Sequence, residues 1–312
     1  FFDYPLSEQF DTIIGNPPYV RYQSIGATTR ARLPQGVLDQ RSNLYLFFIL
    51  KCLAHLKPGG ELIFIVPRDF MKLTSAAPLN RLLFAQGAFT HFEETGDRAI
   101  FAGACPNCVI FRFEKGRCDR TLDDGRTLGM TNGLLHYGGP AAQGTLGDHF
   151  QIRVGAASGA DARFTHEQGN AEFVCSTTRA TGRTRRMIYE QEHPALAAHK
   201  EALLARRIRT FTEANWWRWG RPIPVTPAPR IYVNVKTRHR EPFFIHPAIH
   251  FDGAVLALFP KASMRLERAV AALNQMNWSE MGFMCDGRLL FSQASLSAAP
   301  VACETIQQIL EQ

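Results

Sequence analysis

The first third of the chain alternates short apolar runs with stretches of helical periodicity. The run over residues 61–67 is apolar at nearly every position, which is typical of a strand covered on both faces. Residues 43–56 carry leucine and isoleucine at helical spacing after Asn43, a residue type that caps helices. We expect strands at 11–15, 61–67, 89–93 and 107–113 and helices at 43–56 and 70–86, the second weakened by Pro78. This alternation predicts an α/β domain.

The pattern changes along the remaining chain. Residues 20–42 form a long polar stretch without periodicity, and such loops are usually functional or mobile. Residues 116–150 are rich in glycine and poorly periodic, whereas the part beyond 150 shows further strands and one helix at about 261–276. We therefore expect an α/β domain over 1–118, a linker or irregular segment over 119–150, and a mixed α+β domain over 151–312.

A stiff polar loop follows the first predicted strand. Asn16-Pro17-Pro18-Tyr19 comes directly after the apolar run that ends at Gly15. Proline fixes its own φ and has no backbone N–H, so the chain must leave the sheet here. The loop presents an amide, bare carbonyls and an aromatic ring at the carboxyl end of a strand, which is where open α/β sheets bind ligands.

The strand at 11–15 is apolar on both faces and should be central in its sheet, yet nothing before it can supply a neighbour. An apolar central strand with an open edge favours aggregation. The chain also starts with Phe1 rather than methionine. We expect that a missing N-terminal half or a partner chain completes the sheet.

Composition narrows the class of protein. Hydrophobic residues make up 46% of the chain, as in ordinary globular proteins, and no apolar run reaches the ~18 residues that a membrane span needs. The seven cysteines are odd in number and scattered, which fits a reducing, cytoplasmic setting. Cys105 and Cys108 have no second pair to complete a zinc site, so we expect no metal.

Positive charge is concentrated in one stretch. The whole chain has a formal net charge of +7, whereas residues 176–240 alone hold 14 basic and 4 acidic residues. Tryptophan and tyrosine are interleaved with them, a combination that suits phosphate and base contacts. The alternative is a solvated charged face around a small tryptophan core. The candidate DNA-binding residues are Arg179, Arg183, Arg185, Arg186, Arg218, Arg221, Lys236 and Arg238.

Several segments, in order, resemble a known family. They are Asn16-Pro17-Pro18-Tyr19 after an apolar strand, the helix and strand that run from Ser42 to Pro67, Ile100-Phe101-Ala-Gly before Cys108–Phe113, a glycine-bearing entry at Val154–Gly159, and a closing segment at Gly287–Leu296. Together they resemble the γ-type N6-adenine DNA methyltransferases of restriction–modification systems. The four-residue motif alone is shared with protein-glutamine and some RNA methyltransferases, so the ordered set carries the resemblance.

The resemblance implies a fold and a chemistry. The fold is the C-terminal half of a class I (Rossmann-like) methyltransferase sheet, followed by a DNA target-recognition domain. The implied cofactor is S-adenosyl-L-methionine, whose main binding motifs would lie upstream of Phe1, so the chain should be inactive alone. Phe1 and Asn16 are the implied cofactor contacts. Asn16, Pro17, Tyr19 and Phe101 are the implied catalytic residues, acting on an adenine flipped out of double-stranded DNA.

Two other functions remain open. The acceptors that suit the N6 amine of adenine would serve the N4 amine of cytosine equally well. The chain can also be read as a non-catalytic DNA-binding fragment or subunit that needs a partner for the cofactor site.

Overall fold

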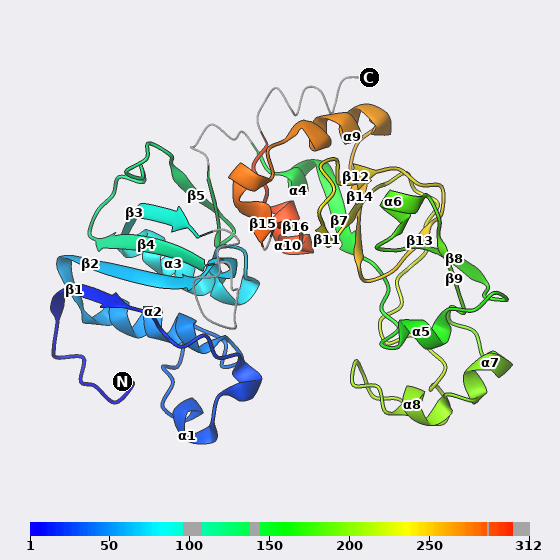
Figure 1. Ribbon diagram of the computed structural model, residues 1–312, viewed down its shortest axis with the longest axis horizontal. Coiled ribbons are helices and arrows are strands. Elements are labelled where there is room, and N and C mark those ends of the chain that lie inside the picture. Colours follow the sequence, from blue (N-terminus) through cyan, green and yellow to red (C-terminus); the bar gives the residue numbers. More distant parts are fainter. Residues whose placement is uncertain (96–107, 138–143, 286, 302–312) are drawn as a thin grey trace. The chain divides into compact units, whose positions relative to one another are not determined.

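The computed structural model describes residues 1–95, 108–137, 144–285 and 287–301, and they fall into two compact units (Figure 1). Unit 1 comprises residues 1–144, 277–289 and 298–302. Unit 2 comprises residues 145–276, 290–297 and 303–312. Residues 119–144 thus belong to the first unit, as do residues 277–289, which the sequence pattern grouped with the C-terminal domain.

Unit 1 is built on a four-stranded sheet in the order β1-β2-β4-β3. Strands β1 (Phe10–Gly15) and β2 (Leu56–Pro67) are parallel. Strand β4 (Cys108–Lys115) is antiparallel to β2 and to β3 (Gly87–Glu94), so β1, β2 and β3 all end at one edge of the sheet. The expected α/β class is confirmed, with one antiparallel strand inside an otherwise parallel arrangement.

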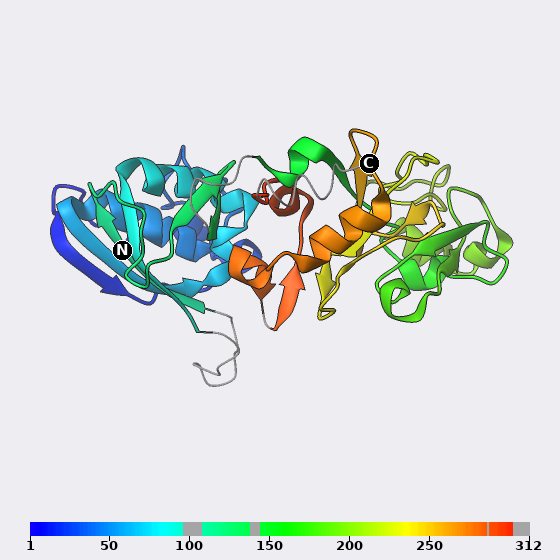
Figure 2. The same cartoon turned by 90° about the horizontal axis from the view of Figure 1, so that it is seen from above.

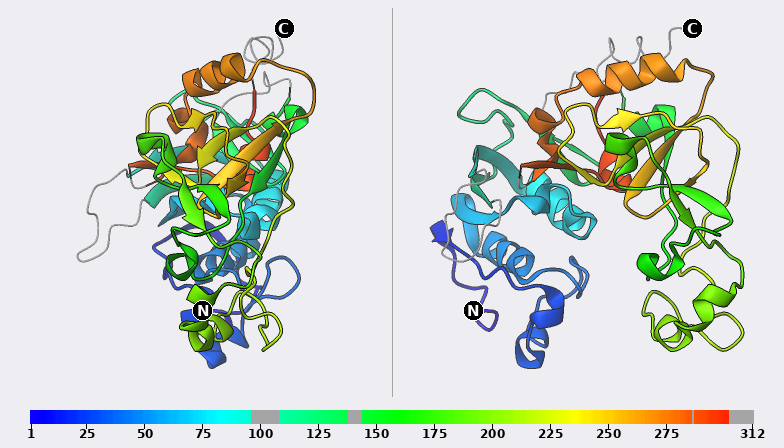
Figure 3. Two further views of the ribbon diagram at one scale, coloured as in Figure 1. Left: turned by 90° about the vertical axis from the view of Figure 1, so that its right-hand side faces the viewer. Right: turned by 45° about the vertical axis from the view of Figure 1, so that its right-hand side comes forward.

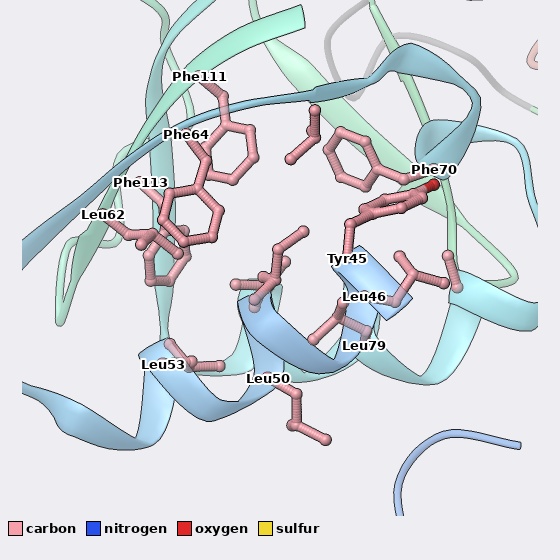
Figure 4. Close-up of a cluster of buried hydrophobic side chains, with 14 of the residues drawn as sticks. Tyr45, Leu46, Leu50, Leu53, Leu62, Phe64, Phe70, Leu79, Phe111 and Phe113 are labelled. Carbon is pink, nitrogen blue, oxygen red and sulfur yellow. The ribbon is translucent and has the colours of Figure 1, made fainter. Parts of the chain in front are cut away.

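Helix α2 (Leu44–His55) covers the sheet because nearly its whole circumference is apolar. Every residue except Phe48 and Ala54 is buried. Figure 4 shows the aromatic rings that the strands direct toward this helix. They are Phe64 from β2 and Phe111 and Phe113 from β4, joined by Phe70 and Tyr45. Burying such rings is worth roughly 1.5–3 kcal/mol each, which makes this layer the main core of unit 1.

The segment at 68–86 differs from the expected single helix. It forms 3₁₀ turns at Arg68–Met71 and Thr74–Ala76 and then α3 (Ala77–Gln86). Pro78 lies in the first turn of α3, where a missing N–H costs nothing because that N–H has no partner in the helix. The proline therefore begins the helix instead of weakening it.

A regular hairpin occupies part of the segment expected to be irregular. Strands β5 (Leu128–Thr131) and β6 (Leu134–Tyr137) pair across Asn132 and Gly133, both at positive φ of 54° and 83°. Such a two-residue turn demands Asn-Gly, so the signal was present in the sequence. The long loop after Tyr19 likewise contains a 3₁₀ turn at Tyr22–Ser24 and the short α1 at Ala27–Arg30.

The late segment of unit 1 begins with a π turn at Ser279–Phe283. Gly282 there has a φ of 86°, a left-handed conformation that favours glycine. Strands β15 (Met284–Cys285) and β16 (Arg288–Leu290) follow as an antiparallel pair.

Unit 2 holds an antiparallel sheet in the order β12-β10-β14-β7. Its strands are β7 (Phe150–Val154), β10 (Ile231–Asn234), β12 (Phe243–Phe244) and β14 (Val255–Pro260). A smaller sheet joins β8 (Ala171–Val174) in parallel to β13 (His250–Phe251) and antiparallel to β9 (Arg185–Met187). The mixed α+β character expected for this region is confirmed.

The helices of unit 2 are short except for α9 (Leu266–Gln275), the orange helix on the right in Figure 2. It lies beside β12. Figures 1 and 3 place α8 and α9 at opposite ends of this unit. The remaining elements are α4 (Leu146–His149), α5 (Asp161–Phe164), α6 (Thr178–Thr181), α7 (Pro194–Ala197), α8 (Lys200–Leu204), β11 (Lys236–Thr237) and α10 (Gln293–Ser297).

Candidate functional site

The loop Asn16–Tyr19 leaves the sheet at the carboxyl end of β1. Gly15 pairs with Phe64 of β2, and a Cβ on this glycine would lie 2.9 Å from the Phe64 ring, so the close approach requires glycine. Asn16 is exposed and Pro17 is buried. Among the described residues, nothing hydrogen-bonds the Asn16 side chain or the Pro17 carbonyl. Two acceptors are therefore free at the edge where β1, β2 and β3 end.

Tyr19 is half-buried and anchored to the sheet through its hydroxyl. The phenol donates to the backbone oxygen of Ile65 over 2.7 Å and accepts from the Cys108 thiol at 3.8 Å. Its ring meets Tyr45 edge-on, with 6.3 Å between the ring centroids. Burial, with the neighbouring Cys108, holds the pKa of Tyr19 well above its ordinary value, so the phenol stays protonated. The hydroxyl thus fixes where the ring lies, at the carboxyl end of β2.

Thr95 and Cys108, which flank the segment expected to supply a second aromatic, are hydrogen-bonded to each other. Thr95 and Cys108 exchange backbone and hydroxyl hydrogen bonds of 2.9, 3.0 and 3.1 Å. Cys108 also contacts the Tyr19 hydroxyl, so the two ends of this segment start next to the loop of the motif. Phe101 itself lies outside the described residues, and its stacking role stays a prediction.

Phe1 lies on the outer side of α2 rather than against the motif. Its ring is 53% exposed and stacks on Phe48 with a centroid distance of 4.6 Å. No contact among the described residues joins Phe1 to Asn16. Ile14 of β1 is 72% exposed at the open edge of the described sheet. The cofactor role of Phe1 and Asn16 remains a prediction.

A buried charged group, which the sequence analysis did not single out, lies at the same edge of the sheet. Arg68 follows β2, is only 4% exposed, and pairs with Glu94 at the end of β3 over 2.5 Å. Tyr137 donates to the same carboxylate over 3.0 Å, and Arg68 also donates to the Met284 carbonyl. The signal in the sequence was a charge directly after a nearly continuous apolar run.

Lys72 completes this group with a second cation. Its ammonium lies 4.4 Å from the centroid of the Phe283 ring. Burial, followed by the charge of the nearby Arg68, lowers the pKa of Lys72 to about 7, although Glu94 partly opposes both effects. Two cations therefore share one carboxylate. The group joins the ends of β2 and β3 to the late segment of unit 1.

The basic stretch of unit 2 divides into paired and unpaired side chains. Arg179 bonds Glu241, Arg186 bonds Glu172, Arg218 lies near Glu190, and Arg221 donates to the Gly155 carbonyl. Arg185 lies 3.7 Å from Asp252, whose pKa is raised to about 6 because burial outweighs its hydrogen bond to Ala254 and the arginine. The candidates that are exposed and have no side-chain partner in the described part of the chain are Arg183, Lys236 and Arg238.

The aromatic residues of this stretch are mostly core. Trp219 is fully buried, stacks on Phe173 with 4.8 Å between centroids, and donates its indole N–H to the Ile188 carbonyl. Trp216 and Tyr232 are buried too. The expectation that these rings are interleaved with arginines at a binding surface is therefore wrong for these three, and the tryptophan-core alternative describes them. Trp217 stays partly exposed, beside Arg218.

Neither a metal site nor a membrane span is found in the part of the chain that the structure describes. No group of three or more histidine, cysteine, aspartate or glutamate side chains could hold a metal there. None of the described helices is both long and apolar enough to cross a bilayer.

Comparison with known families places the N-terminal part in a class of protein. Residues 1–101 match the Eco57I restriction-modification methylase family. They carry the motif loop, α2, β2 and β3. The resemblance to restriction–modification methyltransferases is thus confirmed for this part of the chain.

Individual relatives agree with that class. The Type II methyltransferase M.PaeR7I of Pseudomonas aeruginosa is 40% identical over 140 residues, covering 42% of this chain and 24% of the relative. M.HincII of Haemophilus influenzae is 33% identical over 114 residues, covering 35% of this chain and 23% of the relative. The matched part thus spans about a quarter of the length of these relatives.

A solved structure extends the likeness to almost the whole chain. The Type IIL restriction-modification enzyme MmeI, determined in complex with DNA, covers 92% of this chain with a TM-score of 0.61 and 14% sequence identity. This chain corresponds to 46% of that enzyme. At this identity the likeness shows a shared fold.

Proposed function

We propose that this chain is the substrate-binding part of a restriction–modification DNA methyltransferase that methylates the N6 amine of adenine. The observation that carries the proposal is the exposed, unpaired Asn16 amide next to the free Pro17 carbonyl, at the carboxyl end of a parallel strand. The family match over residues 1–101 supports it.

The two free acceptors suit a weak amine nucleophile. The exocyclic nitrogen of adenine shares its lone pair with the ring, so it attacks poorly. Asn16 Oδ1 and the Pro17 carbonyl can each accept one of its hydrogens, which draws the nitrogen toward sp³ geometry and localises the lone pair. The prolines hold the carbonyl in place, so little reorganisation is needed. Because the methylated amine loses a proton readily, no strong base has to act first.

Tyr19 would stack on the target base. A base must leave the duplex to reach this edge of the sheet, and stacking of roughly 1–3 kcal/mol per ring offsets part of the cost. The hydrogen bond to Ile65 keeps the Tyr19 ring from turning away. Phe101 would stack on the opposite face of the base.

The methyl group would come from S-adenosyl-L-methionine. The exposed Asn16 amide fits a contact to part of that molecule, whereas Phe1 stacks on Phe48 away from the motif loop, and neither residue supplies a charged partner for its amino-acid end. The open edge of β1, where Ile14 is exposed, suits a further strand. We therefore propose that an N-terminal half or a partner subunit brings the remaining cofactor contacts to this edge.

Double-stranded DNA is the proposed partner of unit 2. The support is the charge of residues 176–240 and the exposed, unpaired Arg183, Lys236 and Arg238. Binding to a mixed-sequence duplex should weaken steeply as salt rises, because phosphate contacts release counterions. A filter-binding series with a flat salt response would count against this part.

The decisive experiment compares two variants of Asn16 in the protein completed by its cofactor-binding half. Asn16→Ala should abolish methyl transfer to DNA, whereas Asn16→Asp, which keeps an acceptor, should retain part of it. DNA binding should be unchanged in both variants because Asn16 is not in unit 2. Full methylation by Asn16→Ala would refute the assignment.

Two outcomes would favour the other functions. Nucleoside analysis that finds N4-methylcytosine instead of N6-methyladenine would change the target base and leave the role of the two acceptors intact. DNA binding without any methyl transfer by the completed protein would indicate a non-catalytic DNA-binding subunit.

A further inference from the structure

The turn that follows α8 in unit 2 is pinned by one buried arginine. Arg206 is 8% exposed, and its guanidinium donates to four backbone carbonyls. These belong to Leu203 at 2.8 Å, Ser158 at 2.5 Å, Trp216 at 2.5 Å and Arg218 at 2.9 Å. Three separate segments are thereby fastened together at the start of residues 206–211, which we call the arginine turn.

A second guanidinium in the arginine turn, that of Arg209, contacts an aromatic ring but leaves two hydrogen-bond donors unpaired within the described residues. Arg209 shares the Phe211 ring with Arg206, at 5.1 Å and 3.8 Å from its centroid. The Nε and Nη2 atoms of Arg209 are enclosed, yet neither has a hydrogen-bond partner within the described residues. Elsewhere in the chain, Arg41 grips the Asp39 carboxylate with these same two atoms, at 3.1 and 3.0 Å. The Nε and Nη2 donors of Arg209, which we call the Arg209 fork, are therefore unpaired within the described residues.

The charges of the arginine turn are also unbalanced. No ion pair among the described residues involves Arg206, Arg207 or Arg209, and Arg207 is exposed. Burial, followed by the charge of Arg209, lowers the pKa of Arg206 to about 10. Enclosed donors without a hydrogen-bond partner destabilise the fold, and neighbouring cations repel. An oxyanion would relieve both costs.

We propose that Arg209, with Arg207 beside it, forms an oxyanion site that takes a phosphodiester group of the DNA backbone. The inference rests on the proposed function. It adds Arg207 and Arg209 to the eight candidate DNA contacts named from the sequence for residues 176–240. Rotation about the Arg209 side-chain bonds turns the fork outward, while Arg206 fastens the start of the arginine turn. Arg206 is the positioning residue, and Arg209 is the contact.

The test measures how binding depends on salt. The full chain is titrated with a fluorescein-labelled, mixed-sequence duplex of about 30 base pairs, between about 50 and 200 mM NaCl. Arg209→Gln should lower the slope of log K against log salt by about one, so that the fourfold rise in salt costs this variant roughly 3.5-fold less affinity than wild type. Arg265→Gln is the matched control, because it removes the same charge from the exposed start of α9, at the opposite end of unit 2.

The outcomes separate this site from the proposed function. Wild-type binding with an unchanged slope in Arg209→Gln overturns the site while leaving DNA binding in place. Absence of salt-dependent binding in wild type overturns both. Equal losses in Arg209→Gln and Arg265→Gln would show that only general charge matters, and the site would be refuted.

Thermal unfolding supplies a second readout. Because the fold does not use the Arg209 fork, Arg209→Gln should unfold at the same temperature as wild type or higher, and a clear decrease would assign the guanidinium a structural role instead. Inorganic phosphate, compared with chloride at equal ionic strength, distinguishes the source of the oxyanion. Stabilisation by phosphate that Arg209→Gln abolishes, together with an unchanged DNA slope, would indicate a site for a free anion and refute the DNA contact.

Discussion

Replacing Lys72 by methionine should stabilise unit 1 at neutral pH. The ammonium lies 4.4 Å from the centroid of the Phe283 ring, and the charge of the nearby Arg68 disfavours its protonated form, which Glu94 favours. Its pKa of about 7 in the fold compares with an ordinary value of about 10.4 in the unfolded chain. At pH 7 the unfolded chain is therefore fully protonated at this lysine and the native state about half so.

This difference sets the magnitude and the sign. A shift of about three pKa units bounds the cost of the charged lysine at about 4 kcal/mol at pH 7. Lys72 is partly exposed, so water screens the charge, and we expect Lys72→Met to gain about 1–3 kcal/mol. The unfolded state binds more protons between pH 7 and 10, so the wild-type protein gains stability as pH rises through that range. The gap between the two proteins should narrow toward pH 10.

Urea unfolding between pH 6.5 and 10, followed by circular dichroism, measures the effect as a free energy of unfolding. Lys57→Met is the matched control, since Lys57 is exposed in the same unit and bonds only Asp11 among the described side chains. Its difference from wild type should be small, below about 1 kcal/mol. A gap for Lys72→Met that stays constant between pH 7 and 10, or a less stable variant at pH 7, would contradict this account of the charge.

Three further changes test individual contacts of unit 1, each by thermal or urea unfolding. Tyr19→Phe removes the hydroxyl that bonds the Ile65 carbonyl and should cost about 0.5–1.5 kcal/mol; an unchanged midpoint would mean that the bond does not anchor the loop. Gly133→Ala places a Cβ 2.6 Å from that of Ala77 at a positive φ and should cost about 1–3 kcal/mol, so a neutral effect would contradict the tight turn. Glu94→Gln leaves its buried arginine without a counter-ion and should cost about 3–5 kcal/mol; a loss below about 1 kcal/mol would show that the pair is dispensable.

Local patterns predicted the elements of unit 1 well, because each is encoded over a few neighbouring residues. The apolar strand at 61–67 and the helix after Asn43 lie where their spacing placed them. The Asn132-Gly133 turn was equally readable, since that pair suits the positive φ of a two-residue hairpin, but it was hidden in a stretch that looked irregular. Pro78 was misjudged because a proline's effect depends on whether it lies in the first turn or the interior of a helix.

The candidate site also combines features that the sequence predicted with contacts that only the fold shows. That Asn16 follows a strand is a property of adjacent residues, so the sequence predicted the exposed acceptor. The sequence could not show that Tyr19 is anchored by the Ile65 carbonyl, or that Arg68 reaches Glu94, because these contacts join residues far apart in the chain.

The basic stretch shows most clearly what tertiary structure adds. The sequence by itself determined the motif, the order of strands and helices in unit 1, and the excess of positive charge, since all three are sums or spacings along the chain. Which arginines are paired within the fold and which remain available was decided by the tertiary structure. A guanidinium is paired only if folding brings a carbonyl or carboxylate group next to it. Arg206 donates to four carbonyls and Arg186 pairs with a carboxylate, whereas the Arg209 Nε and Nη2 atoms have no partner among the described residues.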